Sequence, residues 1–290
     1  MNVTQLAYLV IGSDDLPAWR TFATRNLGAM VSGDDSTALR IRLDELEHRI
    51  LVVPTAANGL LASGWATRDS EAYLAAMQVA TDAGVAIEAG SDADCRVRGV
   101  EAYFTFADPS GNVHEVCWGR TQVAEPFSSP AGISSFVTGE LGLGHVALPG
   151  PENYDESLAF YRDVFGFAPS DFFRLPDEGG RGPRVTFLHP RNARQHSLAF
   201  GEIENPYGCL HFMVEVRTLD EVGRMMDRAT QDGLLRRTLG RHVNDEMVSF
   251  YIESPSGLLV EFGYDGMQME WDGHDVRQIP RGSYWGHTWL

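Results

Sequence analysis

Residues 240–263 read G-R-H-V-N-D-E-M-V-S-F-Y-I-E-S-P-S-G-L-L-V-E-F-G, and the rest of the chain is arranged around this stretch. Residues 247–252 are rich in β-branched and aromatic side chains, which is typical of a strand. The S-P-S-G that follows predicts a tight turn, because proline presets φ and glycine accepts positive φ. Residues 258–263 predict a second strand, which places Glu261 between apolar neighbours in a hairpin. A carboxylate buried there needs an opposite charge, a proton or a metal ion.

The chain contains an internal repeat. The aligned segments are Y-F-T-F-A-D-P-S-G-N-V-H-E-V (residues 103–116) with S-F-Y-I-E-S-P-S-G-L-L-V-E-F (residues 249–262), and Q-L-A-Y-L-V-I (residues 5–11) with G-L-G-H-V-A-L (residues 142–148). The alignment places Glu115 on Glu261 and Tyr8 on His145. Similarity at this period indicates duplicated structural units. Only the second copy keeps the histidines, so we expect the first half to be a scaffold without a working site.

Each half alternates short strands with amphipathic helices. Helices are predicted at residues 16–27, 70–83 (with Ser70 as the N-cap), 154–165 and 219–232, and strands at residues 5–11, 38–43, 49–53, 97–106, 113–118, 141–148, 185–188, 197–200, 209–216, 247–252 and 258–263. Residues 121–140 are rich in Ser, Pro and Gly, which favours a connector. We therefore expect an α+β fold of two similar domains, residues 1–125 and 140–290.

Composition excludes several classes of function. With 40 acidic and 23 basic residues the formal charge is −17, so nucleic acid and anionic membrane surfaces are not expected partners. The three cysteines, Cys95, Cys117 and Cys209, have no C-x-x-C spacing, which argues against a disulfide framework or a structural zinc site. No apolar run is long enough for a membrane span, and the first residues lack the pattern of a signal peptide. These features predict a cytoplasmic protein.

Three residues suggest a metal site. His145, His211 and Glu261 each interrupt an otherwise apolar predicted strand of the second half. Two neutral imidazoles and one carboxylate form the facial triad that holds non-haem Fe(II) and leaves positions open for substrate and oxygen. Any one of these histidines taken alone is more simply a hydrogen-bonded core residue. Their equivalent places in repeated modules favour the metal site.

Residues 242–261, H-x-N-D-x-M-x-S-F-Y-x-x-S-P-x-G-x-x-x-E, resemble the signature of type I extradiol ring-cleavage dioxygenases of the vicinal oxygen chelate superfamily. The motifs L-G-H-V-A-L, Q-H-S-L-A-F, L-H-F-M-V-E-V and W-G-H extend the resemblance over essentially the whole chain. The resemblance implies paired βαβββ modules, two in each domain. It also implies that His145, His211 and Glu261 bind Fe(II), although the same ligands accept Mn(II).

The resemblance implies further roles in the site. His196, in Q-H-S-L-A-F, lies beside the metal in this family and transfers protons, and the ordinary pKa of histidine suits transfer in both directions. His242 and Tyr251 lie next to the bound catechol in this family, where Tyr251 would donate to a substrate oxygen and His242 would orient Tyr251 or screen the substrate. Asn244, with Asp245, is expected to fix the loop that carries His242, through local hydrogen bonds.

The resemblance also implies the reaction. Both atoms of O2 enter a catechol, whose ring opens next to the diol during the degradation of aromatic compounds. A 2,3-dihydroxybiphenyl-like bicyclic or alkyl-substituted catechol is the expected substrate, and other catechols remain open. Candidate substrate-contacting residues are His242, Asn244, Tyr251, residues 146–148, Phe187, Ala199 and Pro280. At Leu210 the chain departs from relatives that have a second histidine there, which leaves the substrate preference open.

Other interpretations remain at this point. A glyoxalase-like lyase or isomerase would use the same modules with more protein ligands, commonly a second carboxylate. A non-catalytic binding protein of the superfamily would need no metal triad.

The histidines His48, His114, His189 and His274 are most simply solvated or structural, and the tail from Arg281 to Leu290 is expected to cover the second half. The additional strand edges of the first half favour a homo-oligomer.

Overall fold

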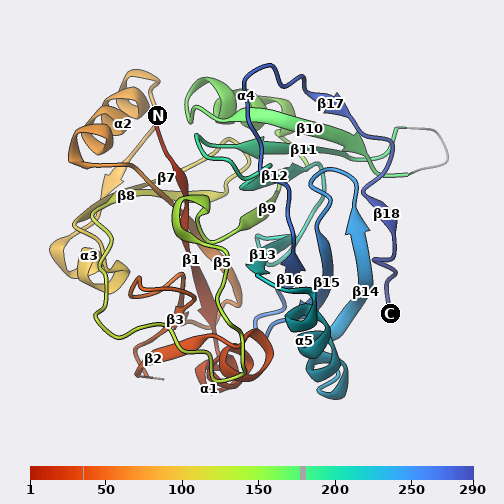
Figure 1. Ribbon diagram of the computed structural model, residues 1–290. Helices are drawn as coiled ribbons and strands as arrows, with labels where there is room; N and C mark the ends of the chain where they lie inside the picture. The colour runs from red at the N-terminus through yellow and green to blue at the C-terminus, as the bar shows by residue number, and fades with distance from the viewer. Residues whose placement is uncertain (35, 177–180) are drawn as a thin grey trace.

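The protein consists of two β-sheets that lie side by side with the helices around them (Figure 1). This architecture is that of a computed structural model, which describes residues 1–34, 36–176 and 181–290. Each half of the chain forms one sheet, and the connector between residues 121 and 140 contains no long helix or strand. The α+β class expected from the sequence is confirmed.

The first sheet has eight strands. In spatial order they are β2 (Met30–Asp34), β3 (Ala38–Arg42), β4 (Ile50–Pro54), β1 (Gln5–Ser13), β5 (Gly59–Ala66), β8 (Val113–Trp118), β7 (Ala102–Ala107) and β6 (Glu88–Ala89). Its helices are α1 (Leu16–Thr21), which continues into the wider turn η1 (Phe22–Leu27), α2 (Ser70–Asp82) and α3 (Asp92–Arg98). Helices α2 and α3 lie on the outer side of the molecule (Figure 1).

The second sheet repeats this order and adds a strand at each edge. Its strands are β17 (Arg277–Gln278), β10 (Ala168–Arg174), β11 (Arg184–His189), β12 (Leu198–Gly201), β9 (His145–Pro149), β13 (His211–Val216), β16 (Leu259–Tyr264), β15 (Val248–Glu253), β14 (Leu235–His242) and β18 (Ser283–Trp285). Its helices are η2 (Gly139–Leu141), α4 (Tyr154–Asp163) and α5 (Leu219–Gln231). The matching strand order shows that the internal repeat is structural.

The strand register confirms the alignment of the two halves. In the first sheet Tyr8 lies opposite Gly64, which in turn lies opposite Glu115. In the second sheet His145 lies opposite Met213, which lies opposite Glu261. Tyr8 and Glu115 therefore occupy the positions of His145 and Glu261, as the sequence alignment predicted.

The two halves share one apolar core. Trp65 on β5 packs against Phe165 and Phe167, which follow α4, with ring centroids 5.7 and 4.8 Å apart. The same cluster extends to Phe250 and Phe262 in the last hairpin. Burial of aromatic surface on both sides stabilises the contact between the halves.

The structure corrects several predicted boundaries. Residues 97–98 end helix α3, not a strand, because Ser91 and Asp94 form a capping box and Gly99 adopts a left-handed conformation that ends the helix. The N-cap of α2 is Asp69, whose carboxylate accepts from the Ala72 amide, and not Ser70. The strand expected from residue 141 begins at His145, after the short helix η2.

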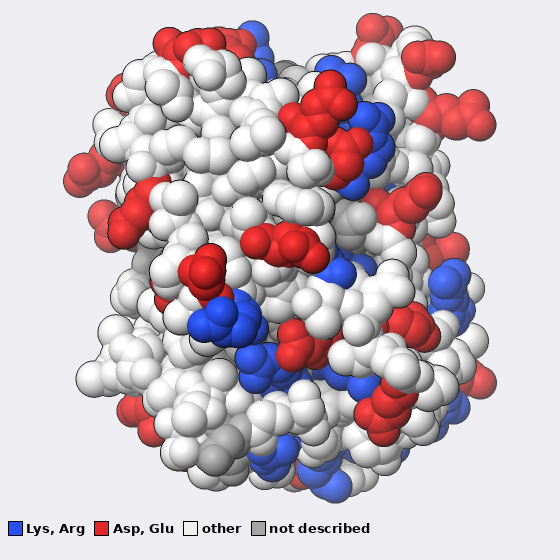
Figure 2. All heavy atoms as spheres, turned by 90° about the vertical axis from the view of Figure 1, so that its left-hand side faces the viewer, with Lys and Arg blue, Asp and Glu red and all other residues white. Residues whose placement is uncertain are grey.

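Acidic side chains are spread over the face drawn in Figure 2, with basic side chains among them. Every basic residue is arginine, because the sequence contains no lysine. Within the described parts of the chain, no helix combines the length and the hydropathy that a membrane span requires.

Candidate active site

The second sheet brings His145, His211 and Glu261 together on one face. His145 and His211 begin β9 and β13, and Glu261 lies within β16. Met213 pairs with both His145 and Glu261 across the three strands. His211 shares the face of Met213 because residues two apart point to the same side of a strand. The fold therefore collects three residues that are far apart in the sequence.

The ligand atoms of this triad face one point. The Nε2 atoms of His145 and His211 are 3.0 Å apart, and Glu261 Oε2 lies 3.2 Å from the first and 3.4 Å from the second. Ligands that meet at right angles, about 2.1 Å from a common ion, are separated by roughly 3 Å. The spacing of the triad therefore fits a small divalent cation.

The protonation states of the triad also fit a cation. Burial lowers the pKa of His145 to about 4, so the imidazole is neutral at pH 7, as a metal ligand must be. Burial tends to raise the pKa of Glu261, but His242 and hydrogen bonds from His145 and His211 outweigh it and hold the value well below normal. Nδ1 of His145 has no hydrogen-bond partner among the described residues, so Nε2 makes the polar contacts of this ring.

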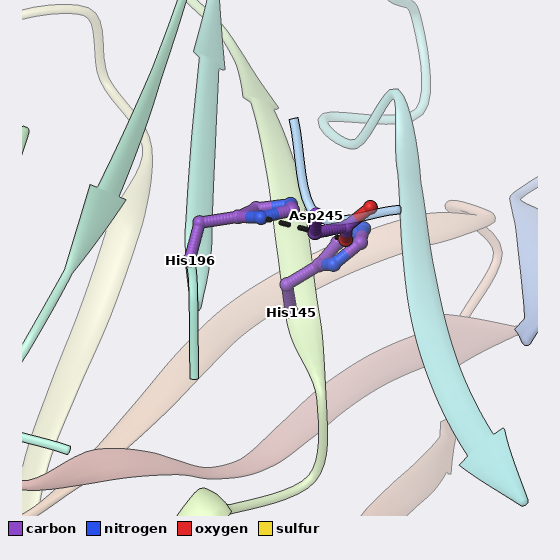
Figure 3. Close-up of side chains that lie close together, drawn as sticks. All are labelled: His145, His196 and Asp245. Carbon is purple, nitrogen blue, oxygen red and sulfur yellow. Dashed lines mark ion pairs between the residues drawn. The ribbon is translucent and has the colours of Figure 1, made fainter. Parts of the chain in front are cut away.

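A second group of possible ligands shares His145. It consists of His145, His196 and Asp245, which come from β9, from the segment before β12 and from the loop between β14 and β15 (Figure 3). His196 Nδ1 lies 3.9 Å from Asp245 Oδ2, but it is already hydrogen bonded to Gln195 Oε1 at 2.7 Å. The first group is the better metal site, because its atoms lie closer together and turn toward one another.

His196 lies directly beside the triad, where the sequence predicted a proton-transfer residue. Its ring stacks on His145 with centroids 4.1 Å apart, and Phe187 packs edge-on against it at 4.8 Å. Burial, followed by the neighbouring His145, holds the pKa of His196 well below its usual value. The ring is therefore neutral, and it is a weaker base than the histidine of ordinary pKa that the sequence analysis assumed.

His242 and Tyr251 lie on the opposite side of Glu261. His242 Nε2 is 2.9 Å from Tyr251 Oη and 3.0 Å from Glu261 Oε1, while Nδ1 lies 3.0 Å from the Gly282 carbonyl. A carboxylate and a carbonyl both accept, so both ring nitrogens of His242 donate. Although burial opposes it, the Glu261 carboxylate raises the pKa of His242 to about 9, which agrees with a charged ring. Tyr251 can accept from His242 and keep its own proton for a substrate oxygen.

Sequence reasoning assigned no role to Ser249 and His287. Ser249 Oγ donates to Glu261 Oε1 at 2.6 Å and lies 3.1 Å from His287 Nε2. His287 comes from the C-terminal tail, and its ring lies 4.2 Å from that of His242. The sequence feature that could have identified His287 is the motif W-G-H, which contributed to the family resemblance but was given no role in the site.

The residues expected to contact substrate differ in their surroundings. Phe187 and Ala199 belong to a buried apolar cluster beside the triad, together with Ala147, Phe173, Val185 and Ile279. Val146 and Leu148, on the other face of β9, belong to the main core. Pro280 is exposed, and the adjacent Ile279 is the residue of this segment that joins the cluster. Leu210 packs against the cluster from its edge.

The loop residues Asn244 and Asp245 are both buried. Asp245 Oδ1 accepts from the Met247 amide, the kind of local hydrogen bond that the sequence predicted. Asn244 accepts from Arg277 through its backbone carbonyl. Burial raises the pKa of Asp245 to about 6, and Glu261 adds to this rise.

The remaining histidines lie away from the triad. His48, His114 and His189 are buried, so the alternative of a solvated histidine is wrong for these three. His114 is hydrogen bonded to Ser63, and His189 stacks on Trp271 with centroids 3.4 Å apart. His274 contacts the Ser170 carbonyl at 2.9 Å. These contacts are structural.

The equivalent place in the first half contains no such triad. Tyr8 Oη donates to Glu115 Oε2 at 2.6 Å, and Arg98 forms a two-point ion pair with the same carboxylate. The arginine supplies the charge that balances a buried carboxylate. Among the described residues, both groups of possible metal ligands lie in the second half.

Comparison with known proteins agrees with this site. Residues 142–262 match the Glyoxalase/Bleomycin resistance protein/Dioxygenase superfamily, and residues 6–54 match the first domain of dihydroxybiphenyl dioxygenase. The chain is 38% identical to an iron-dependent extradiol dioxygenase of Rhodococcus jostii (strain RHA1), with 99% of this chain and 97% of the relative covered. It is 39% identical to a biphenyl-2,3-diol 1,2-dioxygenase of Paraburkholderia xenovorans (strain LB400), with 99% and 96% covered.

Comparison with a solved structure points to the same family. The crystal structure of a halotolerant catechol dioxygenase superposes with a TM-score of 0.90 at 34% identity, covering 99% of this chain and 95% of the other. The likeness includes both sheets, because it extends over nearly the whole chain. From its repeated modules, its full-length relatives and this structural match, the chain belongs to the extradiol dioxygenases of the Glyoxalase/Bleomycin resistance protein/Dioxygenase superfamily.

Proposed function

We propose that this protein opens the ring of a catechol next to the diol, with both atoms of O2 entering the product. The observation that carries the proposal is the convergence of His145, His211 and Glu261, with ligand atoms 3.0 to 3.4 Å apart, in a chain of this family. In the same proposal, residues 140–290 form the catalytic domain and residues 1–125 a scaffold. The Arg98–Glu115 pair at the equivalent place in the first half supports this division.

Fe(II) is the proposed cofactor, held by the two histidines and the carboxylate of the triad. The Rhodococcus relative is an iron-dependent enzyme, which supports this choice over manganese. Iron bound there would supply the electron transfer between the catechol and O2, because the triad leaves positions open for both. The lyase alternative has less support, because Asp245, the second carboxylate nearby, lies in the group with the longer spacing.

The surrounding side chains would handle the protons. Tyr251 would donate a hydrogen bond to a catechol oxygen while it accepts one from His242. His196, neutral and on the other side of the triad, would accept a proton from the substrate and return it as the ring opens. Charged His242 would also hold Glu261 through Oε1 and leave Oε2 for the metal.

The proposed substrate carries an apolar group next to its diol. Ala147 and Ala199 pair across β9 and β12, between His211 on one side and Phe187 on the other. Because the side chains of Ala147 and Ala199 are small, the substrate would contact mainly the aromatic and aliphatic side chains around them. A bicyclic or alkyl-substituted catechol, such as the 2,3-dihydroxybiphenyl named for the relatives, fits these surroundings.

The test is anaerobic reconstitution with Fe(II), followed by 2,3-dihydroxybiphenyl in air, with oxygen uptake and visible absorbance recorded together. We expect one O2 consumed for each catechol and a yellow ring-opened product. The His211→Ala variant should lose iron and activity while its circular dichroism stays unchanged. Iron-loaded protein that consumes no oxygen with this catechol, or with smaller and larger catechols, would contradict the proposal.

We further propose that the chain assembles into a homo-oligomer. Support comes from the edge strand β18 of the second sheet, where Tyr284 and Trp285 are about half exposed, and from Trp289 in the adjacent tail. An exposed apolar edge of this kind favours association. Light scattering after size-exclusion chromatography measures the mass, and a 32.0 kDa species at all concentrations would contradict association.

A further inference from the structure

Asp171 is a buried carboxylate that the proposed reaction does not use. It lies on β10, is 0% exposed, and forms a two-point ion pair with Arg277 at 2.8 and 2.7 Å. Arg277 comes from β17, the strand that pairs with β10 at the sheet edge. Asp171 Oδ2 also accepts from Gln195 Nε2 at 2.9 Å. Arg277 is 46% exposed, so the desolvation cost falls on the buried Asp171 carboxylate, and its hydrogen bonds offset that cost.

The hydrogen bonds from Asp171 to His196 can run in one direction only. An ionised carboxylate only accepts, so Gln195 must turn its NH2 group toward Asp171. The amide oxygen of Gln195 then faces His196, with Oε1 2.7 Å from Nδ1. Because an amide oxygen only accepts, Nδ1 of His196 must carry the proton. In the neutral ring, the lone pair is therefore on Nε2.

Two neighbouring rings hold the plane of the His196 ring. His145 stacks on one face at 4.1 Å, and Phe187 packs edge-on at 4.8 Å. Arg277 also donates to the backbone carbonyl of Asn244 at 3.1 Å, which ties the ion pair to the loop that carries Asp245. The same arginine thus fixes the groups on both sides of His196.

We propose that Arg277, Asp171 and Gln195 form a positioning relay that sets the tautomer and orientation of His196. The proposal rests on the proposed function, because it assumes that His196 transfers protons. A base oriented through a hydrogen bond by a third group is a recurring arrangement in enzymes. None of the three relay residues is expected to touch the substrate.

The first variant for the test is Asp171→Asn, in which the amide can donate or accept and no longer dictates the direction of the hydrogen bonds. With iron content equal to wild type, we expect kcat to fall by about 10- to 100-fold while KM changes little. The double variant Asp171→Asn with Gln195→Glu restores an acceptor facing His196, because the amide introduced at position 171 then donates to the new carboxylate. It should recover most of the lost kcat, which a structural role would not explain.

The matched control is Glu215→Gln. Glu215 is also a buried carboxylate of the second sheet, paired with Arg194 at 2.6 Å, and it makes no hydrogen bond to His196 among the described contacts. We expect its kcat to stay within about twofold of wild type. An equal loss of kcat in this control, or no recovery in the double variant, would overturn the relay. Should Asp171→Asn fail to fold, Gln195→Met removes the same acceptor and leaves the ion pair intact.

Failure of the relay differs from failure of the proposed function. If wild type does not cleave a catechol, or if His196→Ala cleaves it at the wild-type rate, the proposed function or the role of His196 is wrong. If wild type cleaves and His196→Ala is slow, but Asp171→Asn and Gln195→Met turn over normally, only the relay is wrong. Iron analysis of each variant separates both outcomes from loss of the metal.

Discussion

At the scale of single residues, Glu261 is held from two sides. Oε2 faces the histidines of the triad, while Oε1 accepts from Ser249 at 2.6 Å and from His242 at 3.0 Å. Groups that orient a metal ligand typically change metal affinity by about 10- to 100-fold when removed. The groups that hold Oε1 would therefore be part of the proposed metal site, although they lie on the side of Glu261 away from the two histidines.

We predict that Ser249→Ala weakens Fe(II) binding about tenfold without unfolding the chain, because Glu261 loses its shortest hydrogen bond. Competition with a colorimetric chelator under anaerobic conditions measures the affinity. Ser170→Ala is the matched control, since Ser170 is equally buried in the same sheet but donates to the Phe187 carbonyl. Equal affinities of the two variants would show that Ser249 does not support the ligand.

The sequence predicted that His145, His211 and Glu261 come together, and the structure brings them together, while their binding of a metal stays a prediction. His145, His211 and Glu261 were identifiable because each interrupts an apolar strand at an equivalent place in a repeat. The residues that contact His196 directly or through Gln195 could not be predicted, because Asp171 lies 24 residues before Gln195 and Arg277 lies 106 residues after Asp171. Such contacts follow from strand pairing at the sheet edge, and no local pattern in the sequence records them.

At the scale of elements, each half inserts its last hairpin turn against the other half. Ser256 in the second turn accepts from Trp19 Nε1 at 2.8 Å and donates to the Gly12 carbonyl at 2.9 Å. Ser110 in the first turn contacts Ser157 on α4 at 2.8 Å. The turn at S-P-S-G was predicted, and the repeat alignment placed D-P-S-G at the equivalent position, but this reciprocal contact was not predicted.

We predict that Ser256→Ala lowers the free energy of unfolding by about 1–3 kcal/mol, because the buried Trp19 indole loses its hydrogen-bond acceptor. Ser110→Ala, at the equivalent but partly exposed turn position, should cost less, since water can replace the lost partner. Urea unfolding of both variants measures the difference. A larger decrease in the free energy of unfolding for Ser110→Ala than for Ser256→Ala would contradict the importance of burial at these turns.

Two of the strands that sequence analysis missed share a physical feature, whereas β5, which it also missed, is a central and mostly buried strand. Strands β10 and β14 lie toward the edges of the second sheet, and β14 is mostly half-exposed with an irregular register. Neither shows the clear alternation that identifies a strand. Central strands such as β9 and β16 were predicted within a few residues because burial on both faces enriches them in apolar side chains.

At the scale of the whole molecule, a buried polar cluster joins the two halves. Asp108 on the first hairpin turn accepts from Tyr161 on α4 and from Asn112 at 2.9 Å, and it lies 4.0 Å from His114. Burial tends to raise the pKa of Asp108, but His114, Asn112 and Tyr161 together hold it below the usual value. The ionised carboxylate is therefore favoured by folding.

The sign of the pH dependence follows from this lowered pKa. The stability that Asp108 contributes is fully present above the pKa of an unfolded aspartate, about 3.9, and is lost as the pH falls through the lower folded-state pKa. We predict that Asp108→Asn lowers the free energy of unfolding by about 1–3 kcal/mol at pH 7. The gap between variant and wild type should narrow below about pH 3.9, because wild type then loses the same contribution.

Urea unfolding at a series of pH values measures this gap. Asp227→Asn, at an exposed position of α5, removes the same charge without touching the contact between the halves, and its stability should follow wild type at every pH. A gap for Asp108→Asn that stays constant down to acid pH would mean that packing and not the charge of Asp108 is responsible. Because Asp108 and Tyr161 come from opposite halves, a gap that closes in acid would show that the charge of one half stabilises its contact with the other.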